Sequence, residues 1–210
     1  MTIIDALLTT LEDPFILFPL EVVSRKLEDI LAGRDDRMAG RTGWWGVSSK
    51  YRPVDEQHDL EVIRLFIGSA FVLGQSAIAQ TLSVVTRFRV LAGDPPWLPN
   101  GKIHVLSLEA NIHPATGLST IALYDAVANY VTHHNEWPSE WDSATVAQHR
   151  TIHIVLKLGL VPEGQDNLHV ALRNLGLSVT NLSQMGIEIQ EWRERLAVSL
   201  RKQLHDHGLS

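Results

Sequence analysis

Residues 55–92 read DEQHDLEVIRLFIGSAFVLGQSAIAQTLSVVTRFRVLA. Proline is absent from the whole interval between Pro53 and Pro95, and apolar side chains recur within it near the period of an α-helix. The periodic positions are Leu60, Ile63, Ile67, Phe71, Gly74, Ile78, Val85 and Phe88. The stretch therefore predicts one long central helix, with Asp55 as its N-cap.

The middle of this stretch carries no charged residue between Arg64 and Arg87. Its serine, threonine and glutamine side chains are too polar to favour lipid, so we expect a helix buried in a protein core and no membrane span. Ala70, Gly74 and Ala77 form a stripe of small residues along it. Such a stripe predicts the close approach of a second helix.

Proline and glycine positions divide the rest of the chain into further segments. Helices are expected at residues 2–12, 19–31, 117–134, 167–177 and 180–205, and another begins at Ser143 or Thr145 and ends at Leu158, while residues 103–108 form a helix or an extended connection. The interval from Gly33 to Pro53 is rich in polar residues and glycine. It is typical of a long loop, which we expect Trp44 and Trp45 to anchor on the bundle.

Together these segments predict an all-α fold, a single-domain bundle of about six or seven helices. The domain spans residues 1–210 and has its core at roughly 55–205, while residues 1–54 supply N-terminal helices and the Trp-bearing loop. The helices at 55–92 and 117–134 form the frame. We expect the C-terminal helix to pack across them.

The composition argues against several classes of function. None of the 210 residues is a cysteine, which excludes disulfide scaffolds and thiolate metal sites. A net charge of −6 argues against a broad basic surface for duplex DNA. The first residues, Met1 to Asp5, lack the basic start of a secretory signal, so a cytoplasmic location is expected.

One polar stripe offers the clearest candidate site. Asp125, Asn129 and His133 recur every four residues and therefore share one face of the expected helix. Histidine suits general acid–base catalysis near neutral pH, and an amide one turn earlier is placed to orient it or a phosphate oxygen. The alternative is a solvated face on which Asp125 and Asn129 only support the helix. We expect His134 to pack or to cap the helix end, and Glu136 to pair with one of the two histidines.

The long charge-poor helix, followed by a helix that ends in Asn129-Tyr-Val-Thr-His133, resembles the HEPN superfamily. Many of its members are metal-independent ribonucleases of toxin–antitoxin and antiviral defence systems, and their hallmark is an arginine, a polar residue, about three further residues and a histidine. Ala128 stands at the arginine position of this chain. The resemblance covers roughly residues 55–160, and it implies that His133 is the acid–base group and Asn129 the positioning residue.

The resemblance also implies partners. RNA is the implied substrate, no cofactor or metal is implied, and the family commonly forms homodimers in which two such helices face each other across a cleft. A protein partner such as an antitoxin fits the same context. The arginine absent at position 128 would then come from elsewhere, and the candidates are Arg150 and Arg173, which lie near His149 and His169 in the sequence.

A second constellation consists of His149 and His153, whose spacing is that of paired metal-binding histidines on a helix. The glutamate of the zincin motif is absent, and Arg150 would disfavour a cation beside the pair. Because the chain has ten histidines, one such pair also arises by chance. We therefore expect no metal at this position.

Two classes of function follow from the sequence. In the first, the protein is a HEPN-like ribonuclease with His133 and Asn129 at its active site. In the second, it is a non-catalytic helical binding or scaffold protein of the same fold. Ala128 favours the second class, whereas the pairing of Asn129 with His133 favours the first.

Overall fold

The computed structural model describes residues 2–42, 52–162, 164 and 166–208. Within these ranges the protein is all-α, as expected, and has one or two α-helices more than the sequence predicts. The α-helices are α1 (Ile3–Glu12), α2 (Phe18–Thr42), α3 (Arg52–Leu91), α4 (Lys102–Ser107), α5 (Thr120–His133), α6 (Val146–Lys157), α7 (Asn167–Asn174) and α8 (Ser183–Asp206). Three short 3₁₀ helices accompany them: η1 (Pro14–Leu17), η2 (His134–Glu136) and η3 (Trp141–Ser143).

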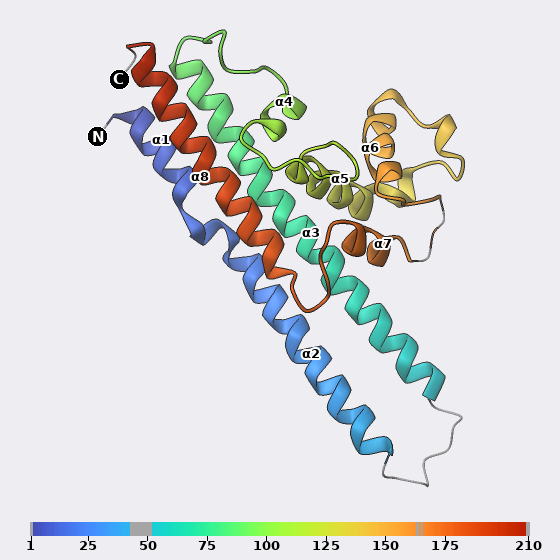
Figure 1. Cartoon of the computed structure of the whole chain (residues 1–210). Helices are drawn as coiled ribbons and strands as arrows, with labels where there is room; N and C mark the ends of the chain where they lie inside the picture. Colours follow the sequence, from blue (N-terminus) through green and yellow to red (C-terminus); the bar gives the residue numbers. More distant parts are fainter. Residues whose placement is uncertain (1, 43–51, 163, 165, 209–210) are drawn as a thin grey trace.

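Helix α3 is the centre of the bundle, because α1, α2, α5 and α8 all pack against it (Figure 1). Its side chains Ile67, Phe71 and Ile78 are fully buried. The segment Leu60–Leu91 is long and apolar enough to cross a membrane by length and composition alone. Its packing on four helices supports the interpretation of this segment as the core helix of a bundle.

The long helix predicted for residues 55–92 is confirmed, but its start is different. Helix α3 begins at Arg52, so Asp55 lies inside the helix and is not its N-cap. Pro53 therefore falls in the first turn. This position tolerates proline because its backbone nitrogen needs no hydrogen-bond partner within the helix.

Helix α2 is longer than the sequence suggests. Gly33 does not end it, and the helix continues to Thr42, so the loop expected from Gly33 to Pro53 is wrong over its first ten residues. A glycine inside a helix costs about 1 kcal/mol relative to alanine, and packing of α2 along α3 offsets such a cost. Trp44 and Trp45 lie outside the described residues.

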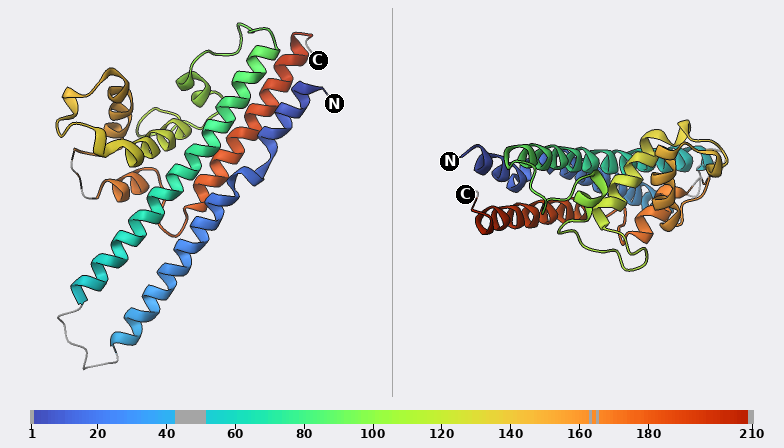
Figure 2. Two further views of the ribbon diagram at one scale, coloured as in Figure 1. Left: turned by 180° about the vertical axis from the view of Figure 1, so that it is seen from behind. Right: turned by 90° about the horizontal axis from the view of Figure 1, so that it is seen from above.

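The C-terminal helix α8 lies alongside α3 and does not cross it, which corrects the predicted packing (Figure 2). It also packs along α1 and α2. A Cβ atom added at Gly74 would lie 3.2 Å from Cδ1 of Ile189 on α8. The stripe of small residues on α3 is thus the place where a second helix comes close, as the sequence predicts.

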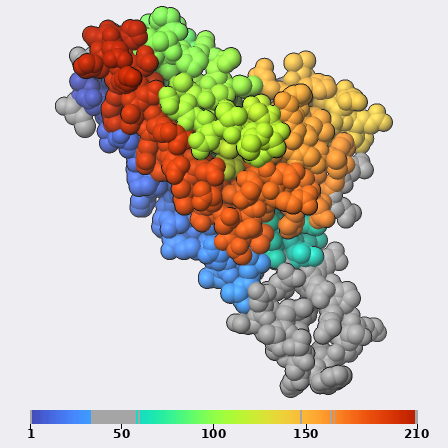
Figure 3. Space-filling view, in the orientation of Figure 1, coloured from blue at the N-terminus to red at the C-terminus, as the bar shows by residue number. Residues whose placement is uncertain are grey.

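Helices α4, α5, α6 and α7 form a second group on one side of α3. Helix α5 packs on α3, and α6 packs in turn on α5. Gly68 of α3 allows this approach, since its missing Cβ would lie 3.2 Å from Cγ1 of Val131. The space-filling view shows the yellow and amber segment that contains α6 projecting sideways from the bundle (Figure 3). The candidate site lies in this group.

Candidate functional site

Asp125 is the centre of a polar network that joins three helices. Its side chain is almost fully buried, and Lys102 of α4 places its Nζ 2.7 Å from Oδ2. Gln75 of α3 donates to Oδ1 at 3.2 Å. Asn129 donates to the backbone oxygen of Asp125 at 2.9 Å and to Oδ2 at 3.2 Å. These partners give Asp125 and Asn129 a structural task, which is to tie α3, α4 and α5 together.

The two residues of the HEPN-like motif bond in opposite directions along α5. Asn129 bonds back to Asp125, one turn toward the start of the helix. His133 lies at the exposed end, where its Nδ1 is 3.2 Å from Oε1 of Glu136. The polar stripe therefore exists on α5, but its hydrogen bonds do not join Asn129 to His133.

Ala128 occupies the position of the arginine in the HEPN pattern, and this position is buried, with Ala128 0% exposed. Of the two replacement candidates, Arg150 lies on α6 in a groove that Ala122 also lines. Ala122 is eleven residues before His133 on the same helix, a separation of about 16 Å along the axis. Arg173 lies exposed on α7.

The groove beside α6 also contains His149 and His153. It has a volume of about 450 Å³ and a mainly apolar lining, to which Ile103, Ile112, Leu118 and Ile154 contribute. Throughout the part of the chain that the structure describes, no group of three or more histidine, aspartate or glutamate side chains is placed to hold a metal ion. The two histidines thus lack a third ligand among these residues.

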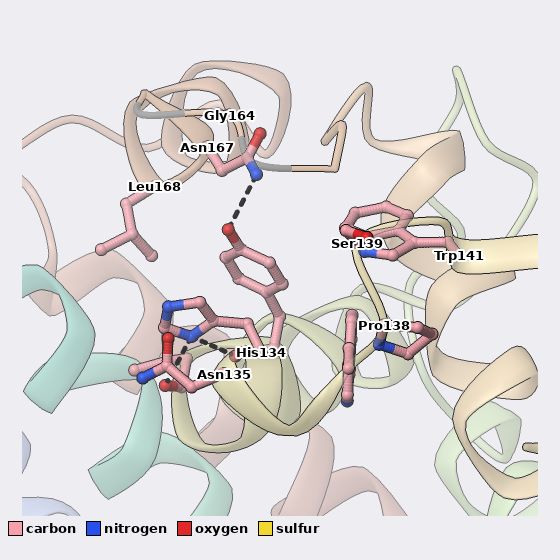
Figure 4. A pocket seen from close by; sticks show the side chains of 11 residues that line it. His134, Asn135, Pro138, Ser139, Trp141, Gly164, Asn167 and Leu168 are labelled. Carbon is pink, nitrogen blue, oxygen red and sulfur yellow. Dashed lines mark hydrogen bonds between the residues drawn. The ribbon is translucent and has the colours of Figure 1, made fainter. Parts of the chain in front are cut away.

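A pocket of about 490 Å³ lies beside the end of α5. It is enclosed by the last turns of α5, the segment that follows it and the beginning of α7. Its lining residues are Tyr130, Val131, His134, Asn135, Trp137, Pro138, Ser139, Trp141, Gly164, Asn167 and Leu168. Figure 4 shows His134 and Leu168 on one side of this space and Pro138 and Trp141 on the other. We refer to it as the aromatic pocket.

Three aromatic rings form one wall of this pocket. The centroids of Trp137 and Trp141 are 5.6 Å apart and their planes are nearly perpendicular, at 81°. Tyr130 lies 5.6 Å from Trp137 and 6.3 Å from Trp141, again with tilted planes. Tyr130 and Trp141 are buried, whereas Trp137 is only half-buried. Edge-to-face packing of this kind holds the rings in fixed orientations.

Two polar groups of the pocket have defined hydrogen-bonding roles. The Tyr130 hydroxyl accepts a hydrogen bond from Nδ2 of Asn167 at 2.8 Å, so it can still donate its own proton. His134 places Nδ1 3.1 Å from the backbone oxygen of Tyr130. Because a carbonyl only accepts, Nδ1 carries a proton, and in the neutral ring Nε2 is an acceptor. His134 thus caps the end of α5, as the sequence suggests, while lining the aromatic pocket.

The sequence contains part of the signal for this pocket. Pro138 forces Trp137 into an extended conformation, which ends the helical segment and turns both tryptophans back toward Tyr130. The concentration of aromatic residues just after α5 indicates such a cluster. Asn167 gives no comparable signal, since it comes 37 residues after Tyr130 and reaches it only through the fold.

Comparisons of the chain with protein-family models, with curated proteins and with solved structures find no match, so the interpretation of the site depends on its geometry.

Proposed function

We propose that this protein is a non-catalytic binding protein of the helical-bundle class and that its ligand occupies the aromatic pocket. One observation carries the proposal: a pocket of about 490 Å³ whose wall is made of Tyr130, Trp137 and Trp141. Ligand pockets of roughly 300–1,000 Å³ that combine aromatic walls with a few polar groups are typical binding sites for small molecules or single side chains. A cytoplasmic location is part of this proposal.

Two features of α5 support binding over catalysis. The hydrogen bonds of Asn129 are used on Asp125, so its amide already has a structural role. Ala128 has no exposed surface, and a side chain at this position faces the core. An arginine placed there would not reach a substrate without rearranging the helix.

The proposal is tested by labelling the protein with 5-fluorotryptophan and recording fluorine NMR spectra during a screen of small fragments. The chain has six tryptophans, and single Trp→Phe variants assign their signals. Trp97 and Trp192 lie outside the pocket and serve as internal controls. Fragments that shift the signals of Trp137 and Trp141 but not those of the controls are expected. A screen in which no fragment shifts the two pocket signals would contradict the proposal.

A second candidate function is the metal-independent ribonuclease that the HEPN resemblance implies. The observation in its favour is the exposed His133, whose Nδ1 lies 3.2 Å from a carboxylate oxygen of Glu136. A histidine oriented by a carboxylate is a usable acid–base group. The ribonuclease role that the resemblance implies would also require Asn129 to break its hydrogen bonds to Asp125. In addition, another segment would have to supply the arginine that is absent at position 128.

Incubation of the purified protein with mixed cellular RNA in EDTA tests this candidate. Cleavage that is lost in His133→Ala would establish it. The matched control is His153→Ala, an exposed histidine of α6 in the other group of candidate residues. Equal cleavage by His133→Ala and the parent would show that His133 is not the catalytic group, and absence of cleavage in both would contradict the ribonuclease candidate.

A further inference from the structure

We infer that the ligand of the aromatic pocket is an organic cation, an alkylated ammonium group. This inference rests on the proposed binding function and specifies the chemistry of its ligand. It follows from three properties of the pocket: the aromatic wall, the distribution of charge around it and the nature of its polar groups.

The aromatic wall is suited to a cation. The faces of tryptophan and tyrosine rings carry a negative potential, and tryptophan attracts cations most strongly. Trp137 and Trp141 pack edge to face, with their planes at 81°. Tyr130 packs against both at centroid distances of 5.6 and 6.3 Å. All three rings line the pocket, and Trp137, which is half-buried, offers the most surface to a ligand.

The charges around the pocket have the complementary sign. Within the described ranges, no lysine or arginine lines it. Glu140 and Asp142 flank Trp141 in the sequence, both are exposed, and neither forms a salt bridge with any residue of the described ranges. Arg64 is paired with Asp166, the neighbour of the lining residue Asn167, at 3.1 Å. An anionic ligand would therefore find no lysine or arginine among the described lining residues.

The polar groups explain why the cation should be alkylated. Among the residues that the structure describes, the lining contains hydroxyl, amide and imidazole groups but no carboxylate. A primary ammonium is strongly hydrated, and entry into the pocket would remove water that these neutral groups replace poorly. Methyl groups on the nitrogen spread the charge and weaken the hydration. They also add contact with apolar lining residues such as Trp137 and Leu168. An alkylated ammonium therefore loses less hydration free energy on entry and gains more van der Waals contact.

Two sources can supply this group: a free small molecule such as choline, or a methylated lysine side chain on a partner protein. The pocket is partly formed by exposed residues, among them Asn135 and Ser139, so it is accessible from the surface. Both sources present the same trimethylammonium group to the rings. The experiment therefore needs one arm for each source.

The test uses the full chain labelled with 5-fluorotryptophan and titrated at about pH 8, where imidazole groups are largely neutral. Choline is compared with 3,3-dimethylbutan-1-ol, its uncharged isostere. We expect choline to bind about tenfold more tightly, with shifts of the Trp137 and Trp141 signals. Equal affinity of the two molecules, or binding of the isostere alone, would overturn the cation inference while leaving the binding pocket itself established.

Variants locate the binding site. Trp137→Leu should abolish choline binding, and because Trp137 is half-buried this variant is expected to fold. Trp97→Leu changes an equally half-buried tryptophan that packs on Phe88, away from the pocket, and should retain full affinity. Retained binding in Trp137→Leu would refute the assignment to this pocket. If no fragment of any charge binds, the proposed function fails together with this inference.

A trimethyllysine peptide forms the second arm, with the same peptide bearing unmodified lysine as its control. Affinity for the modified peptide at least tenfold above that for choline identifies a partner chain as the source. Affinity equal to that of choline identifies a free small molecule. A preference for unmodified lysine would contradict the argument from hydration.

Discussion

Asn167 uses both amide hydrogens and its carbonyl oxygen inside the protein. Nδ2 donates to the hydroxyl of Tyr130 at 2.8 Å and to the backbone oxygen of Val161 at 2.7 Å. Oδ1 accepts from the backbone nitrogen of Val161 at 3.0 Å. The side chain is 4% exposed, so water cannot replace these partners. One residue thereby connects the aromatic pocket to the loop before α7.

Replacement of Asn167 by alanine should therefore lower the free energy of unfolding by about 1–3 kcal/mol, because buried polar groups of Val161 and Tyr130 lose their partner. Urea denaturation followed by circular dichroism measures the change. Asn135→Ala is the control, since Asn135 lines the same pocket but is exposed, and its effect should stay within about 0.5 kcal/mol. Equal effects of the two substitutions would show that the hydrogen bonds of Asn167 carry no special weight.

At the same scale, the sequence predicts the polar stripe of α5 but not its hydrogen bonds. Helical spacing places Asp125, Asn129 and His133 on one face, and all three lie on α5. Spacing along one helix says nothing about Gln75 and Lys102, which come from other helices and bind Asp125. Contacts between distant segments determine which polar residues are occupied structurally.

Helix α8 stabilises the end of α1 through a buried arginine. Arg193 donates to the backbone oxygens of Thr10 at 2.7 Å and Asp13 at 2.9 Å, which lie at the C-terminal end of α1. A cation is favourable there because the helix dipole is negative at this end. Burial lowers the pKa of Arg193, with Asp13 and Glu194 acting in the opposite direction. The charge is held by carbonyl groups rather than by a carboxylate.

We expect Arg193→Ala to reduce the free energy of unfolding by about 2–4 kcal/mol, since it removes a buried side chain and its charged hydrogen bonds to the backbone oxygens of Thr10 and Asp13. Arg193→Lys keeps the charge and should fall between the parent and the alanine variant. Lys202→Ala alters an exposed cation of the same helix and should have an effect within about 0.5 kcal/mol. If thermal or urea denaturation shows the same loss of stability for Lys202→Ala as for Arg193→Ala, the role given to Arg193 would be wrong.

The same two helices also share the ion pair between Glu12 and Arg201, which predicts a pH dependence of stability. The hydrogen bond from Arg201 lowers the pKa of Glu12 below its usual value. The ion pair therefore makes its full contribution to the free energy of unfolding above about pH 4.3, the ordinary pKa of glutamate. This contribution is lost as the pH falls through the lowered pKa of Glu12 in the folded protein. Glu12→Gln should be less stable than the parent by about 0.5–1 kcal/mol at pH 7.

Urea denaturation from pH 7 down to pH 3 should show this difference closing at the acidic end. The control is the same substitution in an Arg201→Ala background, where no difference should remain at any pH. A difference that persists in that background would mean that Glu12 acts through other contacts.

Some helix ends agree with those that the sequence predicts, and others do not. Helix α6 begins after Thr145 and ends at Lys157, close to the prediction, because Thr145 and Gln148 form a capping box that the local sequence specifies. Gly33 gives an equally clear local signal for a helix end, yet α2 passes through it. Packing of α2 on the long helix α3 is a non-local interaction, and it overrides the local preference.

The start of α1 and the end of α8 lie close together at one end of the bundle, where the two helices pack side by side. Helices α2 and α3 extend beyond α8 at the opposite end. The aromatic pocket lies in the side group, away from both ends. Association of two chains at either end would leave the pocket open.

The HEPN resemblance predicts a homodimer. Multi-angle light scattering at about 10 μM should then give a mass of twice the 23.4 kDa chain. Because the family pairs its motif helices, introduction of a charge at the exposed end of α5, as in Thr132→Glu, should weaken the dimer without loss of helicity. Thr86→Glu, at an exposed position of α3, is the matched control. A monomeric mass for the parent chain would contradict the prediction.

The bond from the Val161 amide to Asn167 gives the pocket a kinetic reporter. This amide is protected only while α7 remains docked on the loop before it, since its acceptor is the Asn167 side chain. Its hydrogen exchange rate therefore measures how often the docked arrangement opens. A ligand held against Tyr130 would stabilise the closed arrangement and slow exchange at Val161, although it never touches that amide. Occupancy of the pocket would thus be measured as a longer exchange lifetime of the Val161 amide proton.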